Sequence, residues 1–403
     1  MAPTTLLHRL ALSVALVAAS VVGTVTPAAE AAPAPNAVKL WAATQGGDQT
    51  LTLAQARSNA TNFQMIVGRP VVYRPYIAAL RRIAPETTYI MYMNGLYAQQ
   101  AQGTMYPESW YARDAAGRKI TSIVHGNYLM DPSNPAWVAS RSARCALDTR
   151  VEGWDGCYLD MLGPGPLFPG YNTAIPINPR TGQEWNVADW MTTSSAIGAA
   201  VQRANPTRMV TANGLGTGTQ YFDRASGLTK QLLDGIAAAN SQGFVRGTSV
   251  PINQFRTPET WKRDVDMLAE AGSRGKGVMA MTKIWHVPAT EAQKNAVMHY
   301  TLATFLLGTD GIHSYLYFSD DGAEDAYAQT FKLLQNTYVG QPTAGYVASA
   351  DGTFTRRFTS GFAAVNPGDT AVTITLPRTM KTVGGNAVAS IRLAPQSGEV
   401  LTF

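Results

Sequence analysis

The sequence predicts an α/β protein, a parallel (β/α)8 TIM barrel followed by a small C-terminal antiparallel β-sandwich. First, strand-like and helix-like segments alternate from about residue 38 to residue 336, as they do in parallel sheets. Second, eight strand-like segments can be counted, the number that closes such a barrel. Third, the 403 residues exceed the length of an ordinary barrel, which leaves room for an appended domain.

Each expected strand is a short apolar run that ends near glycine, asparagine or a helix-like segment. The eight expected strands are residues 38–42, 63–67, 88–93, 153–160, 208–212, 235–239, 277–281 and 312–318. Helix-like segments include residues 51–62, 77–83, 135–149, one ending at 204, and two beginning near 258 and 290. A doubly wound open sheet is the alternative, because one miscounted strand would change the architecture.

We expect the barrel to span residues 37–338 and the β-sandwich residues 340–403. In the tail, residues 353–358 and 371–376 alternate between apolar and polar side chains, as half-buried strands do. The sequence Asn-Pro-Gly-Asp at residues 366–369 between them is typical of a hairpin turn.

The N-terminus is typical of a secretory signal peptide, residues 1–31. His8 and Arg9 precede an apolar run over 10–22, and Ala29-Glu30-Ala31 has the small-x-small pattern of a cleavage site. The apolar run is shorter than the ~20 residues of a membrane span. We therefore expect a secreted, extracellular protein that is cleaved near Ala31 and has no membrane span.

Composition argues against several classes of function. The net charge of +5 is mild, and lysines and arginines are scattered, whereas nucleic-acid binders concentrate them. Motifs for a zinc protease, a serine hydrolase elbow and a phosphate-binding loop are absent from the sequence. The glycine-rich residues 214–219 lack the third glycine of a dinucleotide loop. We expect no metal, no cofactor and no nucleic-acid partner, and a monomer.

The chain has two cysteines, Cys145 and Cys157, twelve positions apart. In an exported protein this spacing favours one local disulfide, which would join the helix before the fourth strand to that strand. A reactive thiol is the alternative, but no histidine lies nearby in the sequence.

Asp160 is the first candidate functional residue, because it ends an apolar strand before a glycine- and proline-rich run. A charged carboxylate there loses hydration unless it is paired or faces a cleft. In parallel α/β proteins, chemistry takes place at the carboxyl ends of the strands. The alternative is an aspartate that only caps the following loop.

Three Asp-Gly pairs precede apolar strands, and their acids are Asp155, Asp234 and Asp310. Asp-Gly is turn chemistry, so these acids should lie at the opposite, structural face of the barrel. Counting five residues onward gives Asp160, Ala239 and Tyr315 as equivalent positions at the catalytic face.

Carboxylates, amides and aromatic side chains together favour chemistry on sugars. Glycoside hydrolysis needs two carboxyl groups, and aromatic rings and amides can hold the sugar units. Each of these residues alone could instead be a core or turn residue. The expected substrate-binding side chains are Trp41, Tyr92, Asn94, Asn213, Asn240, Lys283, His286 and Tyr315.

Four motifs together carry a family resemblance. They are residues 80–85 (Leu-Arg-Arg-Ile-Ala-Pro), 110–117 (Trp-Tyr-Ala-Arg-Asp-Ala-Ala-Gly), 131–137 (Asp-Pro-Ser-Asn-Pro-Ala-Trp) and 155–160 (Asp-Gly-Cys-Tyr-Leu-Asp). The chain from about residue 38 to residue 321 resembles the hypothetical glycosyl hydrolases (family 15-like) of secreted bacterial proteins. Its tail is similar to the β domain that follows amylase-like barrels. The resemblance implies a (β/α)8 barrel with Asp160 as a catalytic acid acting on a polysaccharide or oligosaccharide.

The second carboxylate is less evident. Related barrels often carry a glutamate at the end of strand six, where this chain reads Ala-Ala-Ala-Asn over residues 237–240. Asp320, after the eighth strand, is the expected partner of Asp160, with Asp321 or Glu184 as alternatives. Without such a partner, the barrel would be a catalytically silent carbohydrate-binding protein.

Overall fold

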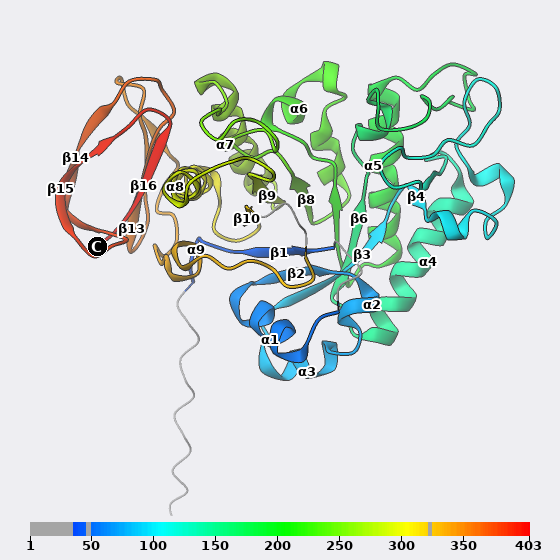
Figure 1. Cartoon of the computed structure of the whole chain (residues 1–403), viewed down its shortest axis with the longest axis horizontal. Helices are drawn as coiled ribbons and strands as arrows, with labels where there is room; N and C mark the ends of the chain where they lie inside the picture. Colours follow the sequence, from blue (N-terminus) through cyan, green and yellow to red (C-terminus); the bar gives the residue numbers. More distant parts are fainter. Residues whose placement is uncertain (1–34, 46–49, 321–324) are drawn as a thin grey trace, which may run out of the picture. The chain divides into compact units, whose positions relative to one another are not determined.

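The structure is a computed structural model that describes residues 35–45, 50–320 and 325–403. The expected signal peptide, residues 1–31, lies outside the described residues. Eight parallel strands form one sheet (Figure 1). In sheet order they are β1 (Trp41–Thr44), β2 (Met65–Gly68), β3 (Thr88–Asn94), β6 (Gly156–Asp160), β7 (Met209–Asn213), β8 (Ala238–Ser241), β9 (Gly277–Lys283) and β10 (Tyr315–Ser319).

The first and last strands meet, so the sheet is a closed barrel rather than an open one. The Leu316 amide donates a hydrogen bond to the Lys39 carbonyl oxygen at 2.8 Å, and Leu40 bridges Leu316 in parallel. The predicted (β/α)8 barrel is confirmed, and its closure excludes the doubly wound alternative.

Helices connect most of the strands and cover the outside of the barrel (Figure 1). They are α1 (Leu53–Asn62), α2 (Pro70–Tyr73), α3 (Ile77–Ile83), α4 (Pro135–Glu152), α5 (Val187–Ala204), α6 (Gly218–Phe222), α7 (Pro258–Ser273), α8 (Glu291–Gly308) and α9 (Lys332–Asn336). Short 3₁₀ turns at Arg224–Ser226 and Thr229–Asp234 complete the connection from β7 to β8.

Helix α4 shows how local sequence places Asp160. The Asn134 side chain accepts hydrogen bonds from the amides of Ala136 and Trp137, and Pro135 occupies the first helical turn. Gly153 ends the helix at φ 79°, a left-handed conformation that suits glycine. Three residues later β6 begins, and its last residue is Asp160.

The predicted disulfide is confirmed. Cys145 of α4 and Cys157 of β6 are bonded, and both are fully buried. The bond joins the helix to the strand that ends at Asp160, and it removes the reactive-thiol alternative.

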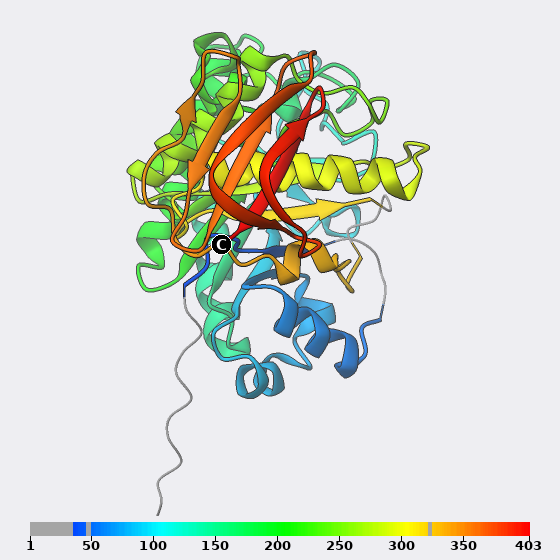
Figure 2. The ribbon, with the colours of Figure 1, turned by 90° about the vertical axis from the view of Figure 1, so that its left-hand side faces the viewer.

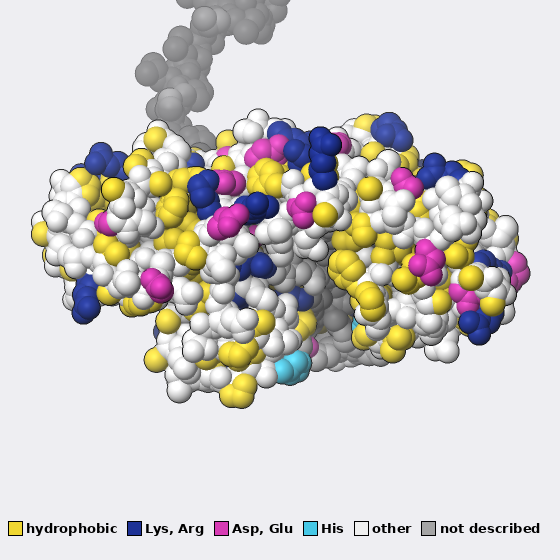
Figure 3. Space-filling model, turned by 90° about the horizontal axis from the view of Figure 1, so that it is seen from above, with side chains coloured by type: hydrophobic (Ala, Val, Ile, Leu, Met, Phe, Trp, Pro, Cys, Tyr) yellow, Lys and Arg dark blue, Asp and Glu magenta, His cyan; other side chains and the backbone are white. Residues whose placement is uncertain are grey.

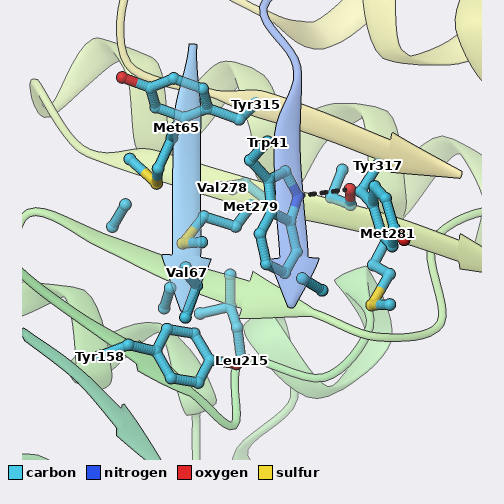
Figure 4. Close-up of a cluster of buried hydrophobic side chains, with 14 of the residues drawn as sticks. Trp41, Met65, Val67, Tyr158, Leu215, Val278, Met279, Met281, Tyr315 and Tyr317 are labelled. Carbon is cyan, nitrogen blue, oxygen red and sulfur yellow. Dashed lines mark hydrogen bonds between the residues drawn. The ribbon is translucent and has the colours of Figure 1, made fainter. Parts of the chain in front are cut away.

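Side chains of the strands fill the barrel interior (Figure 4). Trp41 lies there with its ring centroid 5.6 Å from that of Tyr317, and its indole nitrogen donates to the Ala280 carbonyl oxygen at 3.2 Å. Met279 and Met281 of β9 lie in the same fully buried cluster. The barrel is therefore a packed core rather than a pore.

The C-terminal part is the expected antiparallel β domain. Its strands are β11 (Val347–Ala348), β12 (Phe354–Arg357), β13 (Gly361–Asn366), β14 (Val372–Thr382), β15 (Ala387–Leu393) and β16 (Ser397–Thr402). They hydrogen-bond in the order β11-β12-β13-β16-β14-β15, with β14 joined to β16 only at Lys381 and Thr382. A separate apolar cluster holds side chains of β13, β14, β15 and β16 together.

The β domain lies against α8 (Figures 1 and 2). Ala363, Val365 and Val400 belong to the main core of the barrel, so β13 and β16 pack on both of their faces. In the described part of the chain, no helix is long and apolar enough to cross a membrane.

Candidate active site

A cleft with two arms opens at the carboxyl ends of the barrel strands, and the arms meet at Asp160. Five residues line both arms: Gln45, His125, Asp160, Met161 and Tyr171. The arms enclose about 580 Å³ and about 650 Å³. Figure 3 shows a face of the molecule that is hollowed between two raised parts.

We call the first arm the arginine arm. Its other lining residues are Arg69, Pro70, Val71, Arg74, Met91, Tyr92, Met93, Asn94, Tyr97, Gln99, Gln102, Tyr106, Ser122, Asn127, Arg141, Arg144 and Asp148. We call the second the glycine arm. Its other lining residues are Gly163, Pro164, Gly165, Phe168, Asn213, Gly214, Gly216, Thr217, Gln220, Gln242, Gly243 and Trp285.

The carboxylate of Asp160 is held by one donor on each oxygen. The Tyr92 hydroxyl of β3 donates to Oδ2 at 2.7 Å, and the Asn213 side-chain amide of β7 donates to Oδ1 at 2.8 Å. Both donors are neutral, and the described residues hold no ion pair to Asp160. The structure thus brings together three residues that the sequence analysis singled out, on three adjacent strands.

The backbone around Asp160 is tightly built. The Gly95 amide donates to the Asp160 carbonyl oxygen at 2.9 Å, and a Cβ at Gly95 would lie 2.7 Å from that oxygen. Only glycine allows this approach. Met161, the next residue, adopts φ 68°, an uncommon conformation for a non-glycine residue that turns the chain into the cleft loop.

Two tyrosines lie near Asp160. Burial, reinforced by the Asp160 charge, raises the pKa of Tyr171 to about 12 and raises the pKa of Tyr97 further. Both hydroxyls therefore stay protonated at neutral pH. The Tyr97 hydroxyl donates to the side-chain oxygen of Asn172 at 2.9 Å.

The structure gives Asn94 a structural contact as well as a place in the arginine arm. Its side-chain oxygen accepts hydrogen bonds from the amides of Leu96 and Tyr97 at 3.1 and 2.7 Å. It pairs in register with Asp160 across β3 and β6.

Asp320, the expected second carboxylate, does not line either arm. It forms an ion pair with Lys294 at 3.0 Å, and its other oxygen accepts from the Gln329 side chain at 2.6 Å. This corrects the expectation, because Lys294 of α8 neutralises the charge that catalysis would use. Of the alternatives, Glu184 is exposed and lines neither arm, and Asp321 lies outside the described residues.

Three expected sugar-binding residues lie in the barrel interior or at its other end. Trp41 is fully buried beside Tyr317 (Figure 4). Asn240 is also fully buried, with its side-chain amide donating to the Tyr158 hydroxyl at 3.1 Å. Tyr315 begins β10, three residues after the expected start at residue 312, so it lies at the amino end of its strand. None can contact a sugar in the cleft.

Two further expected binding residues lie at the end of β9 and after it. Lys283 is buried, with its ammonium nitrogen 3.8 Å from the ring centroid of Trp285, which lines the glycine arm. Lys283 supports that ring rather than lining the cleft itself. His286 is exposed at φ 56° and lines neither arm.

The acids of the three Asp-Gly pairs lie before the amino ends of their strands, and none lines the cleft. Asp155 pairs with Arg81 at 2.6 Å, and Asp234 pairs with Arg274. Asp310 accepts from the amides of Ile312 and His313 at 2.9 Å. Their interactions are structural, as the turn chemistry indicates.

Several lining residues were not identified from the sequence. Gln45, Met161 and Tyr171 come from loops, where no periodicity marks a direction. Arg141 and Arg144 are three positions apart on α4, a spacing that places them on one helix face. This spacing is the sequence signal by which Arg141 and Arg144 could have been identified as neighbours. No cluster of three histidine, cysteine or acidic side chains among the described residues could hold a metal ion.

Comparisons with known proteins agree with this fold. The model of hypothetical glycosyl hydrolase family 15 matches residues 72–362. The noncanonic maltogenic α-amylase AmyB from Thermotoga neapolitana is 11% identical, with 91% of this chain and 98% of that chain covered at a TM-score of 0.55. Amy13B of Eubacterium rectale is 10% identical, with coverage of 91% and 96% and a TM-score of 0.54. An α-amylase from Anoxybacillus is 10% identical, with coverage of 87% and 88% and a TM-score of 0.52. No functionally curated protein matches the chain.

Proposed function

The chain belongs to hypothetical glycosyl hydrolase family 15 and is a glycoside hydrolase, and on that premise we propose that it cleaves a polysaccharide or oligosaccharide at Asp160. The carboxylate acts in its charged form on the anomeric carbon, either as the nucleophile or as the base that activates water. The arginine arm and the glycine arm hold the sugar units on either side of the bond that is cleaved.

The observation that carries the proposal is the position and bonding of Asp160. Among the described residues it is the one carboxylate that lines both arms, whereas Asp148 lines only the arginine arm, where it pairs with Arg144. Each oxygen of Asp160 accepts a hydrogen bond from a neutral donor, so both oxygens act as hydrogen-bond acceptors. A carboxylate held in this way suits attack or base catalysis better than proton donation.

The leaving oxygen needs a proton, and we assign this role to His125. In the part of the chain that the structure describes, three ionisable side chains line both arms: Asp160, Tyr171 and His125. Tyr171 keeps its proton because burial raises its pKa to about 12. Histidine is the side chain most often used as a general acid. The exposed His125 ring belongs to the segment between β3 and β6, so it can approach the leaving group from the rim.

Reducing-end release from a panel of soluble polysaccharides tests the proposed activity. Wild type should release new ends from at least one member, and Asp160→Asn should release none while still binding that glycan. An Asp160→Asn variant as active as wild type would remove Asp160 from the mechanism. A wild type that binds glycans but never cleaves them would be the silent carbohydrate-binding barrel.

The role of His125 has a separate test based on the leaving group. His125→Gln should be slow on an alkyl glycoside, whose alkoxide needs a proton, and close to wild type on a 2,4-dinitrophenyl glycoside, whose phenolate does not. Equal losses on both substrates would contradict a proton-donor role.

We also propose that the enzyme acts outside the cell as a monomer, after cleavage near Ala31. The Cys145–Cys157 disulfide supports the location outside the cell, because such bonds persist in oxidising compartments. Amino-terminal sequencing of the exported protein should begin just after Ala31, and a mature chain that retains residues 1–31 would contradict the cleavage.

A further inference from the structure

Among the described lining residues of the arginine arm, positive charges outnumber negative ones. Four guanidinium groups line it, those of Arg69, Arg74, Arg141 and Arg144, and two described carboxylates, those of Asp148 and Asp160. The glycine arm has no arginine or lysine among its described lining residues. The two ends of a bound glycan would therefore meet very different electrostatic surroundings.

Arg74 and Arg144 are neutralised by carboxylates of the protein. Arg74 pairs with Glu152 at 2.5 Å, and Arg144 pairs with Asp148. These pairs fix the outer wall of the arm, and about half of each arginine side chain stays exposed. Their charges are already matched, so they do not by themselves require an anion.

Arg141 is different. Its guanidinium donates only to neutral groups, the Ser140 hydroxyl at 3.0 Å, the Tyr106 hydroxyl at 3.2 Å and the Asn94 carbonyl oxygen at 3.5 Å. Its Nε is buried and has no hydrogen-bond partner. No carboxylate of the described residues lies within ion-pair distance of this group.

The charged form of Arg141 is disfavoured in this environment. Burial lowers the pKa of Arg141, and the neighbouring Arg144 lowers it further against the favourable contacts with Tyr106. The guanidinium also lies 3.9 Å from the Trp137 ring centroid, which holds its plane in place. Arg141 is half-buried. A cation that is partly removed from water without a counter-ion is unfavourable, and the cost falls when an anion binds beside it.

Arg141 is also close to the point of attack. Its Nη1 contacts Asn94, whose Cα pairs with that of Asp160 across β3 and β6. Neighbouring strands lie about 4.8 Å apart. An anion on Arg141 would therefore belong to a sugar unit at or next to the bond that Asp160 attacks.

We propose that Arg141 forms a subsite for an oxyanion on the glycan, in the arm that Arg69 also lines, so that the substrate is an acidic polysaccharide. The oxyanion is the carboxylate of a uronic acid or a sulfate ester, both of which a planar guanidinium binds through paired hydrogen bonds. This inference rests on the proposed function, since it assumes that the cleft holds a glycan.

Matched pairs of probes test it by isothermal titration calorimetry. Oligogalacturonides are compared with their carboxyl-reduced forms, and dextran sulfate with dextran, so that only the anion differs within each pair. Wild type should bind one acidic probe at least tenfold more tightly than its neutral partner, and high salt should reduce that preference. The pair that shows it identifies the oxyanion.

Variants assign the preference to the arm. Arg141→Gln should lose the preference for the acidic probe, and Arg141→Lys should keep part of it. Arg69→Gln should weaken the preference, and it replaces Arg141→Gln if that variant does not fold. Arg118→Gln is the matched control, because Arg118 is 77% exposed, pairs with Asp114 and lines neither arm. Equal binding of acidic and neutral probes, no binding of any acidic probe, or a preference that survives both arm variants would overturn the proposal.

The same titrations separate this inference from the proposed function, because binding does not depend on turnover. A wild type that cleaves only neutral glycans would support the proposed hydrolase activity and contradict the oxyanion subsite. A wild type that binds acidic probes through Arg141 without cleaving any glycan would support the oxyanion subsite and contradict the proposed hydrolase activity.

Discussion

Two aspartates flank the same strand, and their surroundings differ. Asp155 precedes β6 and is held by a cation, Arg81 at 2.6 Å, and by the Tyr89 amide at 2.8 Å. Asp160 ends β6 and is held by two neutral donors, Tyr92 and Asn213, in a cleft. At the two ends of β6, the carboxylate that a cation neutralises lies outside the cleft, and the carboxylate that only neutral donors contact lies in it.

Asp320 fits the same rule. It follows the carboxyl end of β10, as a catalytic acid would, but Lys294 and Gln329 occupy both of its oxygens. A position at the carboxyl end of a strand therefore does not by itself leave a carboxylate without a cation partner.

The largest expected effect is that of Asp160→Asn, which removes the charge but keeps the size of the side chain. Turnover should fall on the order of 10³- to 10⁵-fold, as it does when a catalytic group is removed from an active site. The free energy of unfolding should change by less than about 1 kcal/mol. Steady-state kinetics and urea unfolding measure both quantities. A large loss of stability without a loss of turnover would reverse the roles of Asp160 and Asp155.

Tyr92→Phe should lower turnover by about 10- to 100-fold, because a hydrogen bond to a charged group contributes about 1.5–3 kcal/mol. Tyr89→Phe on the same strand is the matched control. Its hydroxyl donates to the Leu80 and Ala84 carbonyl oxygens at 3.3 and 3.2 Å, away from the cleft. If both variants reduced turnover equally, the contact between Tyr92 and Asp160 would have no special role.

Replacing Cys145 and Cys157 by serine should lower the free energy of unfolding by about 2–3 kcal/mol, because the bond closes a short loop in the unfolded chain. Turnover at low temperature should persist, since neither cysteine lines the cleft. Chemical denaturation of the oxidised wild type and of the double variant provides the comparison, and equal midpoints would contradict the expectation.

Asp155→Ala should cost about 1–2 kcal/mol of stability, mostly because the Tyr89 amide loses its acceptor. The ion pair with Arg81 adds little, since both side chains are about one-third exposed. Turnover should be unchanged where the protein is folded. A fall in turnover at unchanged stability would place Asp155 in the site.

The smallest expected effect is a pH dependence at Asp310. Burial raises the pKa of this carboxyl, but hydrogen bonds from His313 and Ile312 outweigh it and lower the pKa below 3.8. The charged form is therefore favoured in the folded state. The stability that it contributes is present above pH 3.8 and is lost as pH falls through the lowered pKa. Asp310→Asn should lack this acid-dependent loss, and parallel urea titrations between pH 5 and 2.5 would show whether it does.

Much of the fold could be predicted from the sequence, because strand and helix periodicities are local. The strand that ends at Asp160 and the disulfide beside it followed from short segments. The eighth strand begins at Tyr315 instead of residue 312, because Asp310 and the residues after it form a capped turn first. The sequence-based prediction therefore placed Tyr315 at the catalytic face, whereas the structure places it at the amino end of its strand.

The candidate site was predicted less completely, because partners distant in sequence decide it. The pairing of Lys294 with Asp320 depends on how α8 lies beside β10, and local pattern does not show this. Trp41 could be a platform or a core residue, and only the register of β1 places it inside. The partners of Arg141 come from three separate segments of the chain.

Chemical rescue tests the central claim most directly, that Asp160 supplies the charged group at the anomeric carbon. Asp160→Ala leaves space for a small anion, and sodium azide should restore turnover and yield a glycosyl azide. Azide should not change the turnover of Asp155→Ala or Asp320→Ala. The account predicts rescue at Asp160 alone. An Asp160→Ala variant that turns over glycans at the wild-type rate without azide, or that folds, binds glycans and is not rescued, would contradict it.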